Sequence, residues 1–270
     1  MELFSYDFMR NAILAGLLAA IATGIVGVYV VVKKMVFIGG GISHASFGGI
    51  GLGYFLGINP IFGALFFSLA AAISMGFITR KTKLPEDTVI GILWAIGMAL
   101  GIIFIGLTPG YVPDLFSYLF GNILTVPQND LMFMLILDII LVLLVIMLYK
   151  GFLSITFDEE YAAVAGVPVE ILYIVLLCMI ALTIVVLIRV VGIILVIALL
   201  SVPAALAKQF TCDLKKMMLL AILFGAIFTF GGLWISFILD LASGATIILL
   251  SGFVLLTNFG IDRLLSRKES

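Results

Sequence analysis

The sequence predicts an all-α protein, a polytopic transmembrane helical bundle. Of its 270 residues, 64% are hydrophobic and only 11% are charged, and the mean hydropathy is +1.37. Soluble domains carry about 25% charged residues, far more than this chain. Apolar runs long enough to cross about 30 Å of hydrocarbon recur along its whole length. The alternation over about ten residues that is typical of β-barrel strands is missing from the sequence.

The apolar runs define about nine candidate spans, with eight possible because the second and seventh are the shortest. The first run follows two acidic residues and Arg10, unlike the basic start of a signal peptide, so we expect a retained span. No linker or change in composition divides the chain, and residues 1–270 are expected to form a single transmembrane domain. The candidate spans lie near residues 11–32, 41–57, 59–79, 88–108, 130–149, 168–188, 190–207, 217–238 and 243–261.

Basic residues predict the orientation of these spans. With the N-terminus outside and nine alternating spans, all 14 Lys and Arg except Arg10 and Arg189 fall on the cytoplasmic side. Positive charge concentrates in cytoplasmic loops, so the expected topology is N-out/C-in. The segment 109–129 then lies outside or dips into the membrane from the outside.

Several kinds of chemistry are excluded by the residues themselves. The chain has no GxxxxGK[ST] phosphate-binding loop, no HExxH helix and no Ser/His/Asp set, so we expect neither ATP binding nor catalysis. Cys178 and Cys212 lack a metal-type spacing, and no disulfide or redox role is expected. The net charge of −1 says little about partners, because the placement of the charges matters more than their sum. No nucleic-acid partner is expected.

Ionisable groups inside spans are costly and are therefore candidates for function. His44 is the only histidine and stands in the glycine-rich stretch FIGGGISHASFGG, residues 37–49. Those glycines allow close helix packing or a helix break, and His44 is either a ligand on an aqueous pathway or a neutral group bonded between helices. Asp138 is about 13 Å deep in its span. A structural role is favoured for it; pairing with Arg189, a subunit interface and contact with water remain open.

The segment SITFDEEYAAVAGVPVE, residues 154–170, is unlike the rest of the chain. Three acidic residues precede a run of small residues, and Gly166 and Pro168 follow as helix stop signals. Acidic side chains are favourable in the first turn of a helix. This pattern predicts a short cytoplasmic helix at the membrane surface, which is either an ordinary connector or a docking helix for a partner.

Five stretches, in this order and spacing, resemble the permeases of ABC importers for metal ions, the zinc and manganese uptake group. The resemblance covers nearly the whole chain and implies a type II ABC importer permease-like fold. It further implies two copies of the permease, a dimer of a separate cytoplasmic ABC ATPase, and an extracytoplasmic metal-binding protein. The stretches are SHASFGG (43–49), EDTVIGILWAIGMALGI (86–102), DLFSYLFGNIL (114–124), FDEEYAAVAGV (157–167) and VVGIILVIALLSVPAALAKQFT (190–211).

The resemblance also implies roles for particular residues. The histidine of the S-H-A stretch lies on the translocation pathway in this family, so His44 is expected to be a transient metal ligand. Many relatives carry Gly-Asp where this chain has Gly39 and Gly40, so the site lacks that carboxylate. Other residues expected on the pathway are Ser43, Ser46 and Thr88. The stretch near 157–167 is similar to the loop by which importer permeases engage their ATPases, with Phe157, Asp158, Glu159, Glu160, Tyr161, Ala162 and Gly166.

The expected function is therefore a permease subunit that passes Zn²⁺ or Mn²⁺ inward across a bacterial or archaeal cytoplasmic (inner) membrane. The chain itself is expected to bind membrane lipid but no resident cofactor, with ATP held by the partner. One alternative is a type II permease for a metal chelate such as a siderophore or corrinoid, although such permeases are usually longer by about one span. Another is a proton-coupled secondary transporter, which would place carboxylates in corresponding halves of the chain. The sequence alone does not distinguish zinc from manganese.

Overall fold

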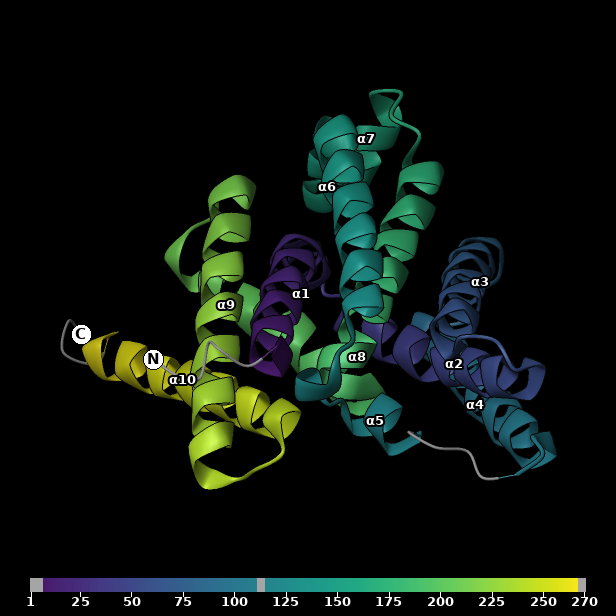
Figure 1. Ribbon diagram of the computed structural model, residues 1–270. Coiled ribbons are helices and arrows are strands. Elements are labelled where there is room, and N and C mark those ends of the chain that lie inside the picture. The colour runs from purple at the N-terminus through teal and green to yellow at the C-terminus, as the bar shows by residue number, and fades with distance from the viewer. Residues whose placement is uncertain (1–6, 111–114, 267–270) are drawn as a thin grey trace.

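The computed structural model describes residues 7–110 and 115–266, and it is helical throughout these ranges apart from short connections (Figure 1). This confirms the all-α fold class. The elements are α1 (Asp7–Val32), α2 (Val36–Leu56), α3 (Pro60–Lys81), α4 (Glu86–Leu107), α5 (Leu115–Phe120), η2 (Ile123–Thr125), α6 (Gln128–Phe157), α7 (Glu159–Val164), α8 (Val169–Phe210), α9 (Leu214–Leu239) and α10 (Ser243–Ser266).

Seven helical segments in the described part of the chain are long and apolar enough to cross a membrane. They are α1, α3, α4, α6, the first half of α8 up to Ile188, α9 and α10. The remaining two predicted runs are helical as well. One is α2, whose glycines, serines and histidine lower its hydropathy, and the other is the shorter apolar segment Val196–Phe210 at the end of α8.

α8 contains a break at Gly192, close to the boundary that the sequence predicts between two spans. Gly192 has φ 75° and ψ 169°, a backbone conformation that only glycine adopts readily. A Cβ atom there would lie 2.3 Å from the backbone nitrogen of Gly121, which follows α5. Ser43 on α2 donates a 2.8 Å hydrogen bond to the carbonyl oxygen of Ile193, next to the break. The polar backbone exposed by the break is thus partly satisfied inside the bundle.

The glycine-rich stretch of α2 is a continuous helix that packs closely on its neighbours. A Cβ atom on Gly49 would lie 2.0 Å from the carbonyl oxygen of Gly63 on α3, and one on Gly97 of α4 would lie 2.4 Å from the Cα of Ala45. Of the two roles that the sequence allows for these glycines, the structure has close packing and not a helix break.

The helices differ strongly in how far the chain itself covers them. The apolar windows of α1 and the first half of α8 are 72% and 78% buried, so these helices form the centre of the bundle. The corresponding window of α4 is only 22% buried, although α4 packs against α2 and α3. Most of the surface of α4 therefore faces lipid or another protein.

Candidate functional site

The short helix α7 lies between α6 and α8 at one end of the bundle (Figure 1). It begins because the Asp158 side chain accepts a 2.8 Å hydrogen bond from the backbone N–H of Tyr161, which caps its first turn. It ends at Gly166, whose φ of 80° lies in the left-handed region. The backbone N–H of Val167 bonds back to the carbonyl oxygen of Ala162, a fully buried residue. The acidic start and glycine stop recognised in the sequence thus produce this helix.

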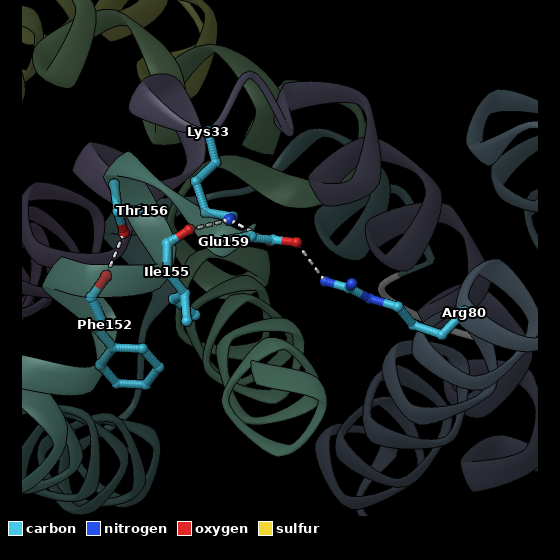
Figure 2. Close-up of polar contacts among 6 residues, drawn as sticks. All are labelled: Lys33, Arg80, Phe152, Ile155, Thr156 and Glu159. Atoms are coloured by element: carbon cyan, nitrogen blue, oxygen red, sulfur yellow. Dashed lines mark hydrogen bonds and ion pairs between the residues drawn. The ribbon is translucent and has the colours of Figure 1, made fainter. Parts of the chain in front are cut away.

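Glu159 fastens α7 to the ends of two other helices, as Figure 2 shows. One carboxylate oxygen accepts a 2.6 Å hydrogen bond from the Lys33 ammonium just after α1, and the other accepts a 2.9 Å bond from the Arg80 guanidinium in the last turn of α3. Lys33 also donates to the carbonyl oxygen of Ile155 near the end of α6. Arg80 in turn lies 4.3 Å from the ring centroid of Tyr173 on α8. We call Lys33, Arg80 and Glu159 the ion cluster.

This cluster is partly shielded from water. The Lys33 side chain is 9% exposed, whereas those of Arg80 and Glu159 are 30% and 33% exposed. Burial alone would raise the pKa of Glu159, but the hydrogen bonds and charges of Lys33 and Arg80 outweigh it and hold that pKa below its ordinary value. The carboxylate therefore stays ionised, and both bonds persist, at neutral pH. Glu86 of α4 joins the three charges in lining a cavity of about 320 Å³.

Apolar side chains on α7 and at the end of α6 are exposed. Phe157, Tyr161 and Val164 are 62%, 70% and 89% exposed. Glu160 is also exposed. Large exposed apolar groups of this kind are typical of surfaces that contact another protein or the membrane.

His44 lies near the middle of α2 and is half-buried against α4. Its ring stacks on Trp94 with a centroid distance of 3.9 Å and an interplanar angle of 23°. Its Nδ1 lies 3.0 Å from the carbonyl oxygen of Gly40. Because a carbonyl oxygen only accepts, Nδ1 carries the proton and Nε2 keeps its lone pair. This arrangement, with one ring nitrogen held by a backbone carbonyl, is typical of histidines that bind metal through the other nitrogen.

The other residues expected on the pathway have different surroundings. Ser43 and Ser46 are fully buried; Ser43 bonds to Ile193 and Ser46 donates to the carbonyl oxygen of Ser43. Thr88 lies in the first turn of α4 and is exposed, whereas the two serines lie on α2 and are buried. Within residues 7–110 and 115–266, no group of three His, Cys, Asp or Glu residues is placed to hold a metal ion. The geometry fits a single imidazole that would contact a passing ion, not a closed metal centre.

Asp138 is buried in α6 with 3% exposure, and neither carboxylate oxygen has a hydrogen-bond partner among the described residues. The side chain of Arg189, a partner considered from the sequence, lies outside the described side chains. Asp138 is thus separate from the ion cluster and from His44. Lys33 and Arg80 are the residues that sequence reasoning did not single out; their position at the ends of spans on the predicted cytoplasmic side is the only local signal.

Comparisons with known proteins agree with this architecture. The model of the ABC 3 transport family matches residues 5–261. The chain belongs to the ABC 3 transport family. The expected family is thereby confirmed, and the chain is a multi-pass protein of the cytoplasmic membrane.

Individual relatives cover nearly the whole chain. An uncharacterized membrane protein of Synechocystis is 48% identical over 97% of this chain and 93% of its own length. The manganese transport system membrane protein MntC of Listeria monocytogenes is 37% identical over 95% of this chain and 91% of its own. Among solved structures, PsaBC from Streptococcus pneumoniae in complex with Fab has a TM-score of 0.86 and 34% identity, with coverage of 96% and 93%.

Proposed function

We propose that this chain is the membrane-spanning permease subunit of an ATP-driven importer for divalent metal ions, Zn²⁺ or Mn²⁺. ATP binding and hydrolysis would take place on a separate cytoplasmic ATPase dimer, and an extracytoplasmic metal-binding protein would deliver the ion. The chain itself would bind no resident cofactor. Membership of a transport family and similarity to a relative named for manganese transport support this proposal.

The main support for the proposal is that α7 has exposed apolar side chains and is bonded through Glu159 to the ends of two other helices. Tyr161 and Val164 of α7 and Phe157 at the end of α6 are exposed, so these apolar side chains could enter a groove on a partner. Behind them, Glu159 bonds α7 to the ends of α1 and α3. A force applied to α7 by an ATPase would therefore reach helices that pack directly on α2. This is the arrangement expected of a coupling helix, in which hydrolysis on a partner drives alternating access.

His44 would be a transient ligand of the transported ion. Its Nε2 lone pair suits Zn²⁺ and other first-row divalent ions, and Gly40 supplies no carboxylate to strengthen the site. A weak site is compatible with transport because an ion in a pathway must also leave. Capture of the ion would rest with the binding protein.

A second copy of the chain would pack against α4. This helix exposes Gly91, Ala95 and Ala99 at intervals of four residues, a spacing that allows close approach between membrane helices. His44 of α2 stacks on Trp94 of this same helix, so a two-fold arrangement there would bring two pathway histidines toward one axis. The ion cluster would lie on the cytoplasmic side of the membrane and the N-terminus outside. Cysteines replacing Lys83 and Thr125, in a chain freed of Cys178 and Cys212, should then be labelled from the inside and the outside respectively.

The proposal is tested by ATP hydrolysis in the complex of permease, ATPase and binding protein reconstituted in lipid. We expect Mn²⁺ or Zn²⁺ bound to the binding protein to stimulate hydrolysis, whereas Mg²⁺, Ca²⁺ and metal chelates do not. The permease alone should neither bind nor hydrolyse ATP. Stimulation by a siderophore or corrinoid, in place of the free ions, would show a chelate importer. A complex with a single permease copy that hydrolyses ATP normally would disprove the two-copy architecture.

A further inference from the structure

A cleft between α6 and α9 lies outside the proposed pathway and the ion cluster. Figure 1 shows α1 between these two helices, and α1 packs against both. The cleft has a volume of about 600 Å³, within the usual range for sites that bind small organic molecules. Its lining residues are Ile25, Val142, Val145, Ile146, Met147, Tyr149, Lys150, Lys215, Met218, Leu219 and Ile222.

The cleft is basic at one end, where Lys150 and Lys215 lie, and apolar along the rest of its length. Val142 precedes Lys150 by eight residues and Ile222 follows Lys215 by seven, so the apolar walls extend about 10–12 Å along the helices from the lysines. The two lysines therefore mark one mouth of an otherwise hydrocarbon-lined space. Both are exposed, and they come from helices that run in opposite directions.

The lysines have charge left for a ligand. Within the described residues neither Lys150 nor Lys215 forms an ion pair. The Lys215 ammonium lies 4.8 Å from the ring centroid of Tyr149, which holds it beside the cleft. The neighbouring carboxylate of Asp213 accepts a 3.0 Å hydrogen bond from the backbone N–H of Lys216 and caps α9. It also attracts the ammonium groups of Lys215 and Lys216, but in the described part of the chain it forms no ion pair with Lys215.

We propose that this cleft binds one anionic glycerophospholipid, with its phosphate between Lys150 and Lys215 and its upper acyl chain along the apolar walls. The charge complementarity selects this occupant, because basic pockets between membrane helices favour anionic head groups. Apart from Tyr149 and the two lysines, the lining residues are apolar and offer nothing to a soluble anion. Ile146, Met147 and Leu219 are 68%, 79% and 68% exposed, so the cleft opens sideways to lipid. With the orientation proposed above, the lipid belongs to the cytoplasmic leaflet. The site itself does not depend on which substrate is transported.

The test is native mass spectrometry of the full-length permease in mild detergent, titrated with phosphatidylglycerol or with phosphatidylcholine of the same acyl chains. We expect the wild type to retain phosphatidylglycerol preferentially, and the Lys150→Gln/Lys215→Gln variant to bind it about 30-fold more weakly, the effect of two membrane-surface lysines. The matched control, Lys81→Gln/Lys83→Gln, removes two exposed charges elsewhere and should change binding little.

A second variant keeps the test decisive if the lysine variant folds poorly. Ile146→Trp places a bulky side chain at the exposed side of the cleft and leaves both lysines, so it should also weaken retention of phosphatidylglycerol. Three results would overturn the proposal: equal retention of phosphatidylcholine, equal losses in the Lys81/Lys83 control, or displacement of the lipid by excess inorganic phosphate, which would indicate a simple anion site.

Discussion

Replacing Glu159 with glutamine removes the charge that fastens α7 to the bundle and should loosen that helix. The change leaves Lys33, whose side chain is 9% exposed, with the carbonyl oxygen of Ile155 and without its carboxylate partner. A hydrogen bond to a charged group contributes about 1.5–3 kcal/mol. The bond to Arg80, which is 30% exposed and screened by water, adds at most about 1 kcal/mol. Because glutamine still offers one oxygen, the net loss should be about 2 kcal/mol.

A loss of that size raises the fraction of molecules with α7 undocked about 30-fold. Amide hydrogen exchange at Ala162 and Ala165, whose N–H groups bond within the α7 segment, measures this directly in the permease without its ATPase. In the assembled importer, the same variant should hydrolyse ATP but take up little metal, because a movement of α7 driven by the ATPase is no longer transmitted to α1 and α3.

Glu160→Gln is the matched control, because it removes the same charge from the next residue, which is exposed. It should leave exchange in α7 unchanged. The reasoning would be refuted if amide hydrogens in α7 exchanged equally fast in the Glu159 and Glu160 variants and both variants took up metal equally well. The pH dependence gives a second check. Since the pKa of Glu159 is lowered, its contribution is complete above the ordinary value of 4.5 and is lost only as pH falls below it, through the folded-state pKa.

Three further changes test other parts of the account. His44→Ala should lower metal uptake at least about tenfold while the thermal stability and basal ATP hydrolysis of the complex stay near wild type; unchanged uptake would leave the ring a purely structural group. Gly192→Ala should lower the free energy of unfolding of the permease by about 3 kcal/mol or more, because the positive φ of Gly192 and its contact with α5 exclude a Cβ atom. In the same unfolding assay, the control Gly252→Ala should change the free energy of unfolding by no more than about 1 kcal/mol, because a Cβ atom there meets open space. Gly166→Val should make the folding of α7 less favourable by about 2 kcal/mol, because valine is strained at the positive φ of this position, and it should uncouple ATP hydrolysis from metal uptake. Gly166→Asn should have a smaller effect, because asparagine tolerates left-handed φ. Equal coupling in both variants would show that φ at this position is unimportant.

The sequence predicted the parts of this structure that depend on local patterns. Long apolar runs became membrane-length helices because hydrocarbon length and backbone hydrogen bonding leave few alternatives. Asp158 and Gly166 marked the start and end of α7 because capping and positive φ are properties of single residues. The family resemblance rested on stretches of this kind and is confirmed by the family match.

The pairings between distant residues could not be predicted in the same way. Glu159 meets Lys33 and Arg80 across separations of 126 and 79 residues, and Ser43 meets Ile193 across 150. The charge bias placed both basic residues on the same side as the 157–167 segment, but it carries no information on which carboxylate they contact. Likewise, glycine spacing in α2 allowed either close packing or a break, and only the positions of α3 and α4 decide between them.

We propose that this chain conducts a divalent metal ion under the control of a partner ATPase. The most direct measurement is uptake of radiolabelled Mn²⁺ and Zn²⁺ into proteoliposomes that contain the permease and ATPase, with metal-loaded binding protein outside and ATP inside. We predict accumulation of at least one of these ions that requires ATP, requires the ATPase and falls in the Glu159→Gln variant. Accumulation by the permease alone, driven by a proton gradient without ATP, would contradict the account.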